Sequence, residues 1–342
     1  MSDSIISLRN VCKRYGRTQA LDHLSLEVPE GVVFALLGEN GAGKTTMIRI
    51  LTGFVQPDSG SATVLGHSAS DGAMQIRQSI GYVSDAPALY DWMKAEEIGW
   101  FTSAFYDDAF PLRYLELLAA FDVPTGVRLK NMSKGQRAKV ALALATAHDP
   151  KLLILDEPTS GLDPMVRRQF LESMVDRAAL GRTVLLSSHQ ISEVERVADW
   201  VAIVHKGMLK VCEPLETLRA RTLIVTATLD HASTTVAVPA GNVLCESRNG
   251  RQMRWVVSDL SDDWRAFYGP DSGVTDAVAV PATLEEIFVA VCDDRAVRPA
   301  ALNSDAIGPG MNGPNDRRGT SEHAVAGQTV PARSITDHSL HR

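Results

Sequence analysis

Four residues between positions 38 and 45 have the types and the spacing of a loop that holds phosphate groups. Gly38, Gly43, Lys44 and Thr45 fit the pattern G-x-x-x-x-G-K-[ST] and follow an apolar run that begins at Val32. The glycines permit a tight turn in which successive backbone N–H groups point at phosphate oxygens. Lys44 supplies a positive charge for the outer phosphates of a nucleotide, and Thr45 supplies a hydroxyl for Mg²⁺. The strand-loop-helix context favours this interpretation over a glycine-rich turn that binds nothing.

Two adjacent carboxylates follow a second apolar run. Residues 152–155 are Leu-Leu-Ile-Leu, which is typical of a strand covered on both faces, and Asp156 and Glu157 come directly after them. Two carboxylates at such a place are costly unless a cation is close. Mg²⁺ bound to a nucleotide is the natural partner, so we expect Asp156 to hold the ion and Glu157 to orient and polarise the attacking water. An ordinary turn at a strand end is the less favoured alternative.

A histidine and a helix start offer two further groups for phosphate binding. His189 follows the apolar strand predicted at 183–188, where it could donate a hydrogen bond to a γ-phosphate, although a single histidine is more often structural. Ser133 and Gln136 have the spacing of a capping box at the start of a helix that runs to Ala145. Such a helix start, with no acidic residue in its first turn, is also an anion site.

Two other residues have a local structural explanation beside a functional one. Tyr15 lies next to the turn predicted at 16–17, where it could stack on an adenine ring or be an incidental exposed aromatic. Asp163 is followed by Pro164, which indicates a helix cap with proline at the first helical position.

Alternating strands and helices must position these residues. Short strands are predicted within 5–30, at 61–65 and at 80–83, and a helical insertion is predicted over 88–130. Together with the two buried strands that precede Glu157 and His189, this order predicts a parallel sheet with helices on both faces. The chemical residues fall at the carboxyl ends of the strands, where such sheets bind ligands.

Composition excludes some classes of protein. The chain has 342 residues and a net charge of −7, so no overall positive field indicates nucleic acid as a partner. Its four cysteines are far apart and show no disulfide-dense layout, which fits a reducing compartment. No uncharged apolar run approaches the roughly 20 residues of a membrane span, and we expect the chain to stay in the cytosol.

The order of the motifs carries a resemblance to a known family. Residues from about 10 to 220 resemble the nucleotide-binding subunit of an ATP-binding-cassette (ABC) transporter. The family's motifs follow in order: a Walker A loop at 38–46, a signature at 132–136, a Walker B strand at 152–156 with Glu157 after it, a D-loop at 160–163 and the switch histidine His189. The resemblance implies an α/β P-loop NTPase cassette with an N-terminal antiparallel β subdomain, a mostly parallel core sheet and a helical subdomain at about 86–148. It implies nucleotide contacts from Tyr15, Gly38, Asn40, Gly41, Gly43, Lys44, Thr45, Thr46, Ser133, Gly135, Gln136 and Asp163, metal contacts from Thr45, Asp156 and Asp85, and catalytic roles for Glu157, His189 and Lys44.

The resemblance also implies partners. Two copies of the chain would sandwich two ATP molecules, each bound by the Walker residues of one copy and by Ser133, Gly135 and Gln136 of the other. A separate membrane permease would hold the pair at the inner face of the cell membrane, and ATP hydrolysis would drive export. An importer subunit is the alternative within transporters. A soluble ABC ATPase that acts on nucleic acid or ribosomes is less favoured, because the chain has neither a second cassette nor a long insertion.

The sequence departs from the family pattern at three positions. Met132 and Lys134 stand in the signature where leucine and glycine are usual, and Asp85 stands where the family usually has a glutamine that contacts Mg²⁺ and water. An ionised Asp85 beside a γ-phosphate would place two negative charges together. Two like unit charges 4 Å apart repel by about 4 kcal/mol at an effective dielectric constant of 20. We therefore expect Asp85 to contact the metal through water or to point away from the nucleotide.

The amino-acid pattern changes after residue 220. Alternating strands are predicted at 223–229, 234–238 and 243–257, the last folded at Asn249 and Gly250, with a terminal helix at 283–290. This small α+β accessory domain, residues 221–294, resembles the appendage of ATPase subunits from drug, antibiotic-peptide or lipid exporters. Residues 295–342 lack periodicity and large apolar side chains, which predicts a disordered tail.

Overall fold

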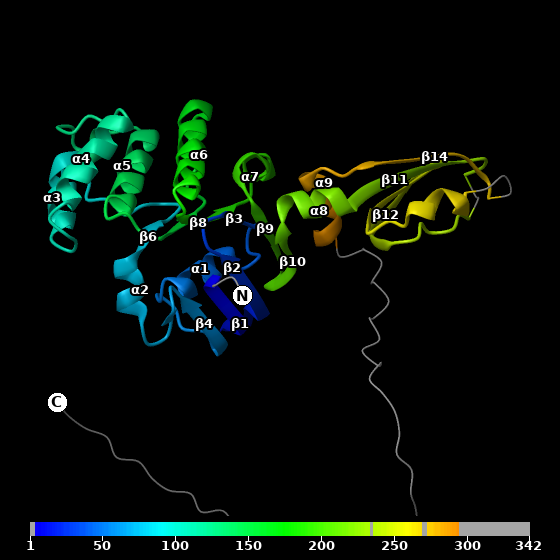
Figure 1. Ribbon diagram of the computed structural model, residues 1–342, viewed down its shortest axis with the longest axis horizontal. Coiled ribbons are helices and arrows are strands. Elements are labelled where there is room, and N and C mark those ends of the chain that lie inside the picture. Colours follow the sequence, from blue (N-terminus) through cyan, green and yellow to red (C-terminus); the bar gives the residue numbers. More distant parts are fainter. Residues whose placement is uncertain (1–3, 233–234, 269–271, 294–342) are drawn as a thin grey trace, which may run out of the picture. The chain divides into compact units, whose positions relative to one another are not determined.

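The computed structural model describes residues 4–232, 235–268 and 272–293, so the tail predicted at 295–342 lies outside the described residues (Figure 1). An antiparallel sheet in the order β2-β1-β4-β5 forms the N-terminal part. Its strands are β1 (Ser4–Tyr15), β2 (Thr18–Pro29), β4 (Ser59–Val64) and β5 (His67–Ser68). The first two strands are therefore long, 12 residues each, and the prediction of short strands there was wrong.

A six-stranded core sheet follows the order β10-β9-β3-β8-β7-β6. Its strands are β3 (Val33–Leu37), β6 (Ile80–Val83), β7 (Leu152–Asp156), β8 (Thr183–Ser188), β9 (Trp200–His205) and β10 (Met208–Pro214). All neighbours are parallel except β9 and β10. The prediction of a mostly parallel sheet is thus confirmed, and β3, β7 and β8 meet side by side, so their carboxyl ends share one edge.

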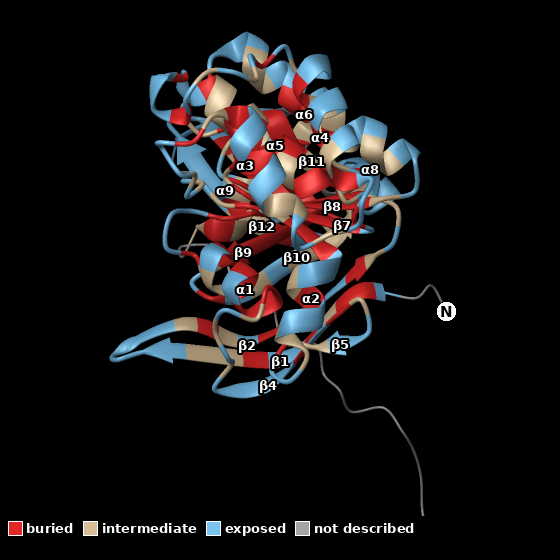
Figure 2. Cartoon of the chain, turned by 90° about the vertical axis from the view of Figure 1, so that its left-hand side faces the viewer, coloured by how far each residue is buried: buried red, intermediate tan, exposed pale blue. Residues whose placement is uncertain are grey.

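Both faces of the core sheet are covered, which explains the uninterrupted apolar runs. On one face Phe34, Ile154 and Leu185 pack with residues of α1 and the N-terminal sheet. On the other face, Leu153 and Leu186 pack with side chains of α5 and α6. Figure 2 shows β7, β8 and β9 as buried strands. The helices of this part are α1 (Lys44–Leu51), α2 (Ala73–Ser79), α5 (Lys134–Thr146), α6 (Pro164–Ala179), α7 (Ile191–Val197) and α8 (Leu215–Arg221).

The predicted helical insertion is confirmed and has its own core. Helices α3 (Ala95–Ser103) and α4 (Phe110–Ala120) lie with α5 beside the β6 edge of the sheet (Figure 1), after which a short 3₁₀ helix (Leu129–Asn131) leads into α5. Phe110, Tyr114 and Leu118 form the buried face of α4. The Tyr114 hydroxyl donates a hydrogen bond of 2.8 Å to the Ala95 carbonyl oxygen, which ties α4 to the start of α3.

The C-terminal part is a four-stranded antiparallel sheet with a closing helix. It comprises β11 (Thr222–Leu229), β12 (Asn242–Asn249), β13 (Gln252–Ser258), β14 (Val274–Pro281), a 3₁₀ helix (Asp262–Phe267) and α9 (Leu284–Cys292). The predicted hairpin between β12 and β13 is confirmed. The strand predicted at 234–238 is wrong for its described part, 235–238, which is not a strand. Instead, β14 pairs with β11. Among the described residues, no helix is long and apolar enough to cross a membrane.

Candidate functional site

The phosphate loop connects β3 to α1 in a conformation that requires glycine. A Cβ atom on Gly38 would lie 2.6 Å from the Val204 carbonyl oxygen, and one on Gly43 would lie 2.5 Å from the Ala20 carbonyl oxygen. Gly43 also has a φ of 112°, which disfavours other residues. Helix α1 begins without a side-chain cap and without an acidic residue in its first turn. Its first N–H groups are therefore suited to an anion, as the sequence predicts.

Lys44 lies inside this loop rather than on the surface. Its side chain is 6% exposed, and Nζ donates hydrogen bonds to the Gly38 carbonyl oxygen at 2.6 Å and the Glu39 carbonyl oxygen at 3.3 Å. Nζ also lies 3.5 Å from Oε1 of Glu157, which directly follows β7. The loop thus holds the ammonium group where it faces both the phosphate cradle and the carboxylate.

Glu157 has an unusual backbone conformation. Its φ is 51°, in the left-handed region that costs a non-glycine residue free energy and that occurs often at functional sites. Its backbone N–H donates to the Ser187 carbonyl oxygen at 3.0 Å, which holds the turn against β8. Oε2 lies 2.7 Å from Nδ1 of His189. The structure therefore brings Lys44, Glu157 and His189 together from the ends of three adjacent strands.

Asp156 and Thr45 form an oxygen-rich corner beside this group. Asp156 is 3% exposed, and its Oδ1 and the Ser187 hydroxyl are buried with no hydrogen-bond partner among the described residues. Burial raises the pKa of Asp156 from its ordinary 3.8, although the nearby hydroxyls of Ser187 and Thr45 act in the opposite direction. Unpartnered carboxylate and hydroxyl oxygens are the ligands that Mg²⁺ takes in proteins, so these residues fit that ion.

The signature helix has the capping box that the sequence predicts. The Ser133 hydroxyl accepts a hydrogen bond from the Gln136 backbone N–H at 3.1 Å, and the Gln136 side chain accepts one from the Ser133 backbone N–H at 3.0 Å. Gly135 is buried, and a Cβ atom there would lie 3.3 Å from both methyl groups of Val166 on α6. Ser133 itself is exposed at the helix start. Its hydroxyl is thus already aligned with the helix axis and reachable from outside the chain.

The other predicted nucleotide contacts lie at turns. Asn40 and Gly41 are exposed in the phosphate loop, and Thr46 is in the first turn of α1. Tyr15 ends β1 with 45% of its surface exposed, and Nζ of Lys13 lies over its ring, 5.7 Å from the centroid. Asp163 caps α6, because its Oδ1 accepts hydrogen bonds from the N–H groups of the second and third residues of that helix.

Asp85 lines a cavity of about 330 Å³ that the sequence could not indicate. Lys134 and Arg137 of the signature helix and Ser160 of the D-loop line the same cavity. The unusual aspartate and the unusual lysine therefore face one space. The structure gives Asp85 no ion pair among the described residues and leaves it exposed.

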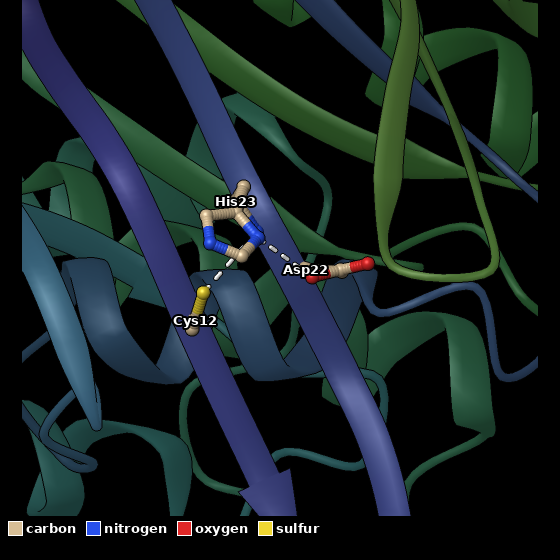
Figure 3. A group of neighbouring side chains, drawn as sticks. All are labelled: Cys12, Asp22 and His23. Atoms are coloured by element: carbon tan, nitrogen blue, oxygen red, sulfur yellow. Dashed lines mark hydrogen bonds and ion pairs between the residues drawn. The ribbon is translucent and has the colours of Figure 1, made fainter. Parts of the chain in front are cut away.

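Two side-chain groups escaped prediction because each joins residues that are distant in sequence. Thr159, beyond Glu157, donates a hydrogen bond to buried Glu193 on α7. Cys12, Asp22 and His23 lie together on β1 and β2 (Figure 3), where a bulge with His23 at a φ of 47° sets two residues against one. Glu193 lies in the mixed run Ile-Ser-Glu-Val-Glu at 191–195, in which no sequence signal distinguishes it from Glu195.

A glycine-rich phosphate loop on one strand and a carboxylate pair at the end of a parallel strand in the same sheet define a P-loop nucleotide-binding domain. Residues 21–160 match the family model described as ABC transporter. The chain is 33% identical over 276 residues to the Nod factor export ATP-binding protein I of Sinorhizobium fredii, covering 74% of this chain and 79% of that protein.

A second relative extends over more of the chain. It is the daunorubicin resistance ATP-binding protein DrrA3 of Streptomyces coeruleorubidus, 31% identical over 317 residues, which are 88% of this chain and all of that protein. Among solved structures, a dimeric post-hydrolysis ATP-binding cassette bound to ADP and Pi matches with a TM-score of 0.56 and 25% identity, over 61% of this chain and 98% of that one. This chain belongs to the family of ABC transporter ATP-binding proteins.

Proposed function

We propose that this chain is the Mg²⁺-dependent ATPase subunit of an exporter whose permease is a separate polypeptide. The observation that carries the proposal is the convergence of Lys44 and His189 on the Glu157 carboxylate, beside the phosphate loop. Such a carboxylate, held on two sides, is suited to orient a water molecule for attack on the γ-phosphate. The cassette is proposed to span residues 1–220 and the accessory domain 221–294.

Each residue has a distinct role in this mechanism. Lys44 binds the β- and γ-phosphates, and Glu157 accepts a hydrogen bond from the attacking water and polarises it. Since an ionised carboxylate only accepts hydrogen bonds, Nδ1 of His189 carries the proton that faces Glu157. Nε2 then donates to a γ-phosphate when the imidazole carries both protons. Asp156 and Thr45 would hold Mg²⁺, which supplies charge neutralisation of the phosphate oxygens.

A second copy of the chain completes the site in this proposal. Ser133 is exposed at the start of a helix that has no acidic residue in its first turn, and Ser133, Gly135 and Gln136 would meet a γ-phosphate there. Asp163 and the D-loop precede α6 close to this helix, since Gly135 contacts Val166. The dimeric cassette among the similar structures supports a sandwich in which each ATP is bound by both copies.

The helical subdomain offers a surface for the permease, which would hold the chain at the cytoplasmic face of the membrane. Five aromatic side chains there are more than 40% exposed: Tyr90, Trp92, Trp100, Phe101 and Phe105. Ring contacts join four of them in the order Trp92, Tyr90, Phe101 and Phe105, and Trp100 is next to Phe101 in the sequence. A contiguous exposed apolar patch of this kind marks an interaction site. The export function named for the Sinorhizobium relative supports export as the direction of transport.

Glu157→Gln in the full chain tests the hydrolytic role. We expect the variant to bind ATP with unchanged affinity, to lose phosphate release, and to form an ATP-dependent dimer on size-exclusion chromatography. Glu172→Gln, which alters an exposed ion pair on α6, is the matched control and should hydrolyse ATP at the wild-type rate. Normal hydrolysis by the Glu157 variant would refute the assignment.

Trp100→Ser tests the permease surface separately. Because Trp100 is 76% exposed, the isolated chain should keep its fold and its ATPase activity. Coexpressed with its permease, the variant should be recovered from the soluble fraction instead of the membrane fraction. Membrane recovery equal to that of wild type would contradict the assigned surface, and recovery of wild type as a nucleic-acid complex would contradict a transport function.

A further inference from the structure

A buried carboxylate on α7 connects two loops of the site. Glu193 is 4% exposed. Its Oε2 accepts a hydrogen bond of 2.7 Å from the hydroxyl of Thr159, which is itself 2% exposed. Its Oε1 lies 3.0 Å from Nε of Arg167 on α6, an ion pair whose geometry is not that of a hydrogen bond. A charged side chain this deeply buried is costly unless it is paired, and these two partners compensate Glu193.

The two partners belong to the segment that leaves the catalytic strand. Thr159 is two residues beyond Glu157, and the turn between them is tight, because the Ser160 N–H donates to the Glu157 carbonyl oxygen at 3.2 Å and the Leu162 N–H donates to the Thr159 carbonyl oxygen at 3.1 Å. Movement of Thr159 therefore displaces the backbone of Glu157, whose φ of 51° must be held by its surroundings.

Glu193 itself belongs to the segment that leaves the neighbouring strand. Its N–H donates to the Gln190 carbonyl oxygen at 3.2 Å, next to His189. The contact between Glu193 and Thr159 is thus a second link between the ends of β7 and β8, parallel to the link between Glu157 and His189. Unlike that first link, it is buried away from water and from the phosphate loop.

We propose that Glu193 is a positioning residue that holds Thr159 and the D-loop in register with His189, so that Glu157 keeps its orientation toward the attacking water. This role rests on the proposed ATPase function. A buried carboxylate with purely structural value could be replaced by an apolar side chain of similar volume without loss of activity. A positioning role requires an acceptor for the Thr159 hydroxyl.

The variants separate these two roles. Glu193→Leu removes the acceptor and the charge, Glu193→Gln keeps an acceptor for Thr159, and Thr159→Ser keeps the hydroxyl that Thr159→Val removes. We expect Glu193→Leu and Thr159→Val to lower kcat by about 10- to 100-fold with KM for ATP nearly unchanged, as loss of orientation does. Thr159→Ser should retain wild-type kcat and Glu193→Gln an intermediate value.

The matched control is Glu195→Gln on the same helix. Glu195 Oε1 accepts a hydrogen bond of 3.1 Å from the Leu284 N–H, at the start of α9, and so faces away from the D-loop. Its variant should leave kcat unchanged. An equal loss of kcat in Glu193→Leu and Glu195→Gln would overturn the positioning role. A loss of kcat in Glu193→Leu that merely follows the unfolded fraction in thermal melts would overturn it as well.

Hydrogen exchange reads out the same inference without turnover. Amides of residues 157–163 should exchange faster in Glu193→Leu than in wild type, whereas Glu195→Gln should leave them unchanged, since local protection reports local opening. Unchanged exchange in Glu193→Leu would overturn the inference. If the wild-type chain binds ATP but does not hydrolyse it, the proposed ATPase function fails. Faster exchange of residues 157–163 in Glu193→Leu would then still support the positioning role.

Discussion

Nδ1 of His189 lies 2.7 Å from Oε2 of Glu157, and the backbone N–H of His189 points at the same oxygen from 3.3 Å. The carboxylate oxygen is therefore oriented by two groups of one residue at the end of β8. Oε1, the other oxygen, lies 3.5 Å from the Lys44 ammonium group. Both carboxylate oxygens are thus held from neighbouring strands, and the orientation of Glu157 depends on His189.

His189→Ala should slow hydrolysis while leaving ATP binding intact. The variant loses the side-chain hydrogen bond that orients Glu157, and removal of a group that assists general base catalysis costs about 100-fold in rate. Phosphate release and ATP affinity, measured on the same preparation, check this expectation. His67→Ala, at an exposed position on β5, is the control. Weakened ATP binding with an unchanged rate constant would show that His189 serves binding instead.

Much of this site could be predicted from local sequence because its parts are local. The phosphate loop and the strand ends are encoded by spacing within a few residues, and parallel pairing then places Lys44, Glu157 and His189 together. The left-handed backbone of Glu157 could not be predicted, since it depends on the Ser187 carbonyl oxygen across the sheet. The Thr159 to Glu193 contact spans 34 residues and leaves no periodic pattern.

The strand pairing of the accessory sheet could not be predicted from local sequence. Residues 234–238 alternate like a strand, yet the edge of β11 is taken by β14, a strand with mostly exposed or half-buried residues that the sequence did not indicate. Period-two alternation identifies a segment that can form a strand, but pairing depends on which segment reaches the open edge. In the structure, residues of α7 and α9 share one buried cluster with residues of β11 and β13.

Gly99→Ala should destabilise the helical subdomain despite the higher helix propensity of alanine. A Cβ atom on Gly99 would lie 2.1 Å from the Tyr114 ring, which is 1% exposed and has no space to retreat. Overpacking of this kind costs about 1–3 kcal/mol. Gly126→Ala is the matched control, because a Cβ atom there meets nothing within 4 Å. The urea concentration at the midpoint of unfolding should be lower than that of wild type only for Gly99→Ala. Equal midpoints for the two variants would show that α3 and α4 adjust freely.

His148 should make stability fall in mild acid. Its ring stacks on Tyr106, with the ring centroids 4.3 Å apart. Burial lowers the pKa of His148 from the ordinary 6.5, and the nearby Arg177 lowers it further. The contact of Nε2 with the Ile80 carbonyl oxygen raises the pKa but does not outweigh burial. Below pH 6.5 the unfolded chain therefore binds a proton that the folded chain does not, and the free energy of unfolding decreases as pH falls toward the lower folded pKa.

His148→Phe removes this titration and keeps the stacking on Tyr106. The free energy of unfolding of wild type minus that of the variant should decrease between pH 7.5 and pH 5.5, by at most about 1.4 kcal/mol for each pH unit. Urea unfolding at a series of pH values measures the difference, in which the other titrating groups cancel. A flat difference for His148 would show that its ring becomes protonated in the folded chain as readily as in the unfolded chain.

Asp85 and Lys134 should act as a pair, because the two charged residues that replace neutral ones line the same cavity. A Cβ atom on Gly161 would lie 2.6 Å from Nζ of Lys134, so the ammonium group lies over the D-loop, and Ser160 and Asp85 line the adjoining space. Closure of this space would bring an ionised Asp85 toward a γ-phosphate, where like charges repel, and Lys134 is the cation on hand to offset that repulsion.

A double-mutant cycle tests this pairing. Asp85→Gln and Lys134→Gly should each change the ATPase rate and its Mg²⁺ dependence, and the double variant should lie closer to wild type than the product of the two single effects. High salt should weaken the coupling, since both side chains are exposed. Independent single effects would assign the two residues separate roles. If Asp85→Gln leaves the rate, the Mg²⁺ dependence and the coupling to the permease unchanged, Asp85 does not reach the active site, because a change of charge next to a phosphate must alter at least one of them.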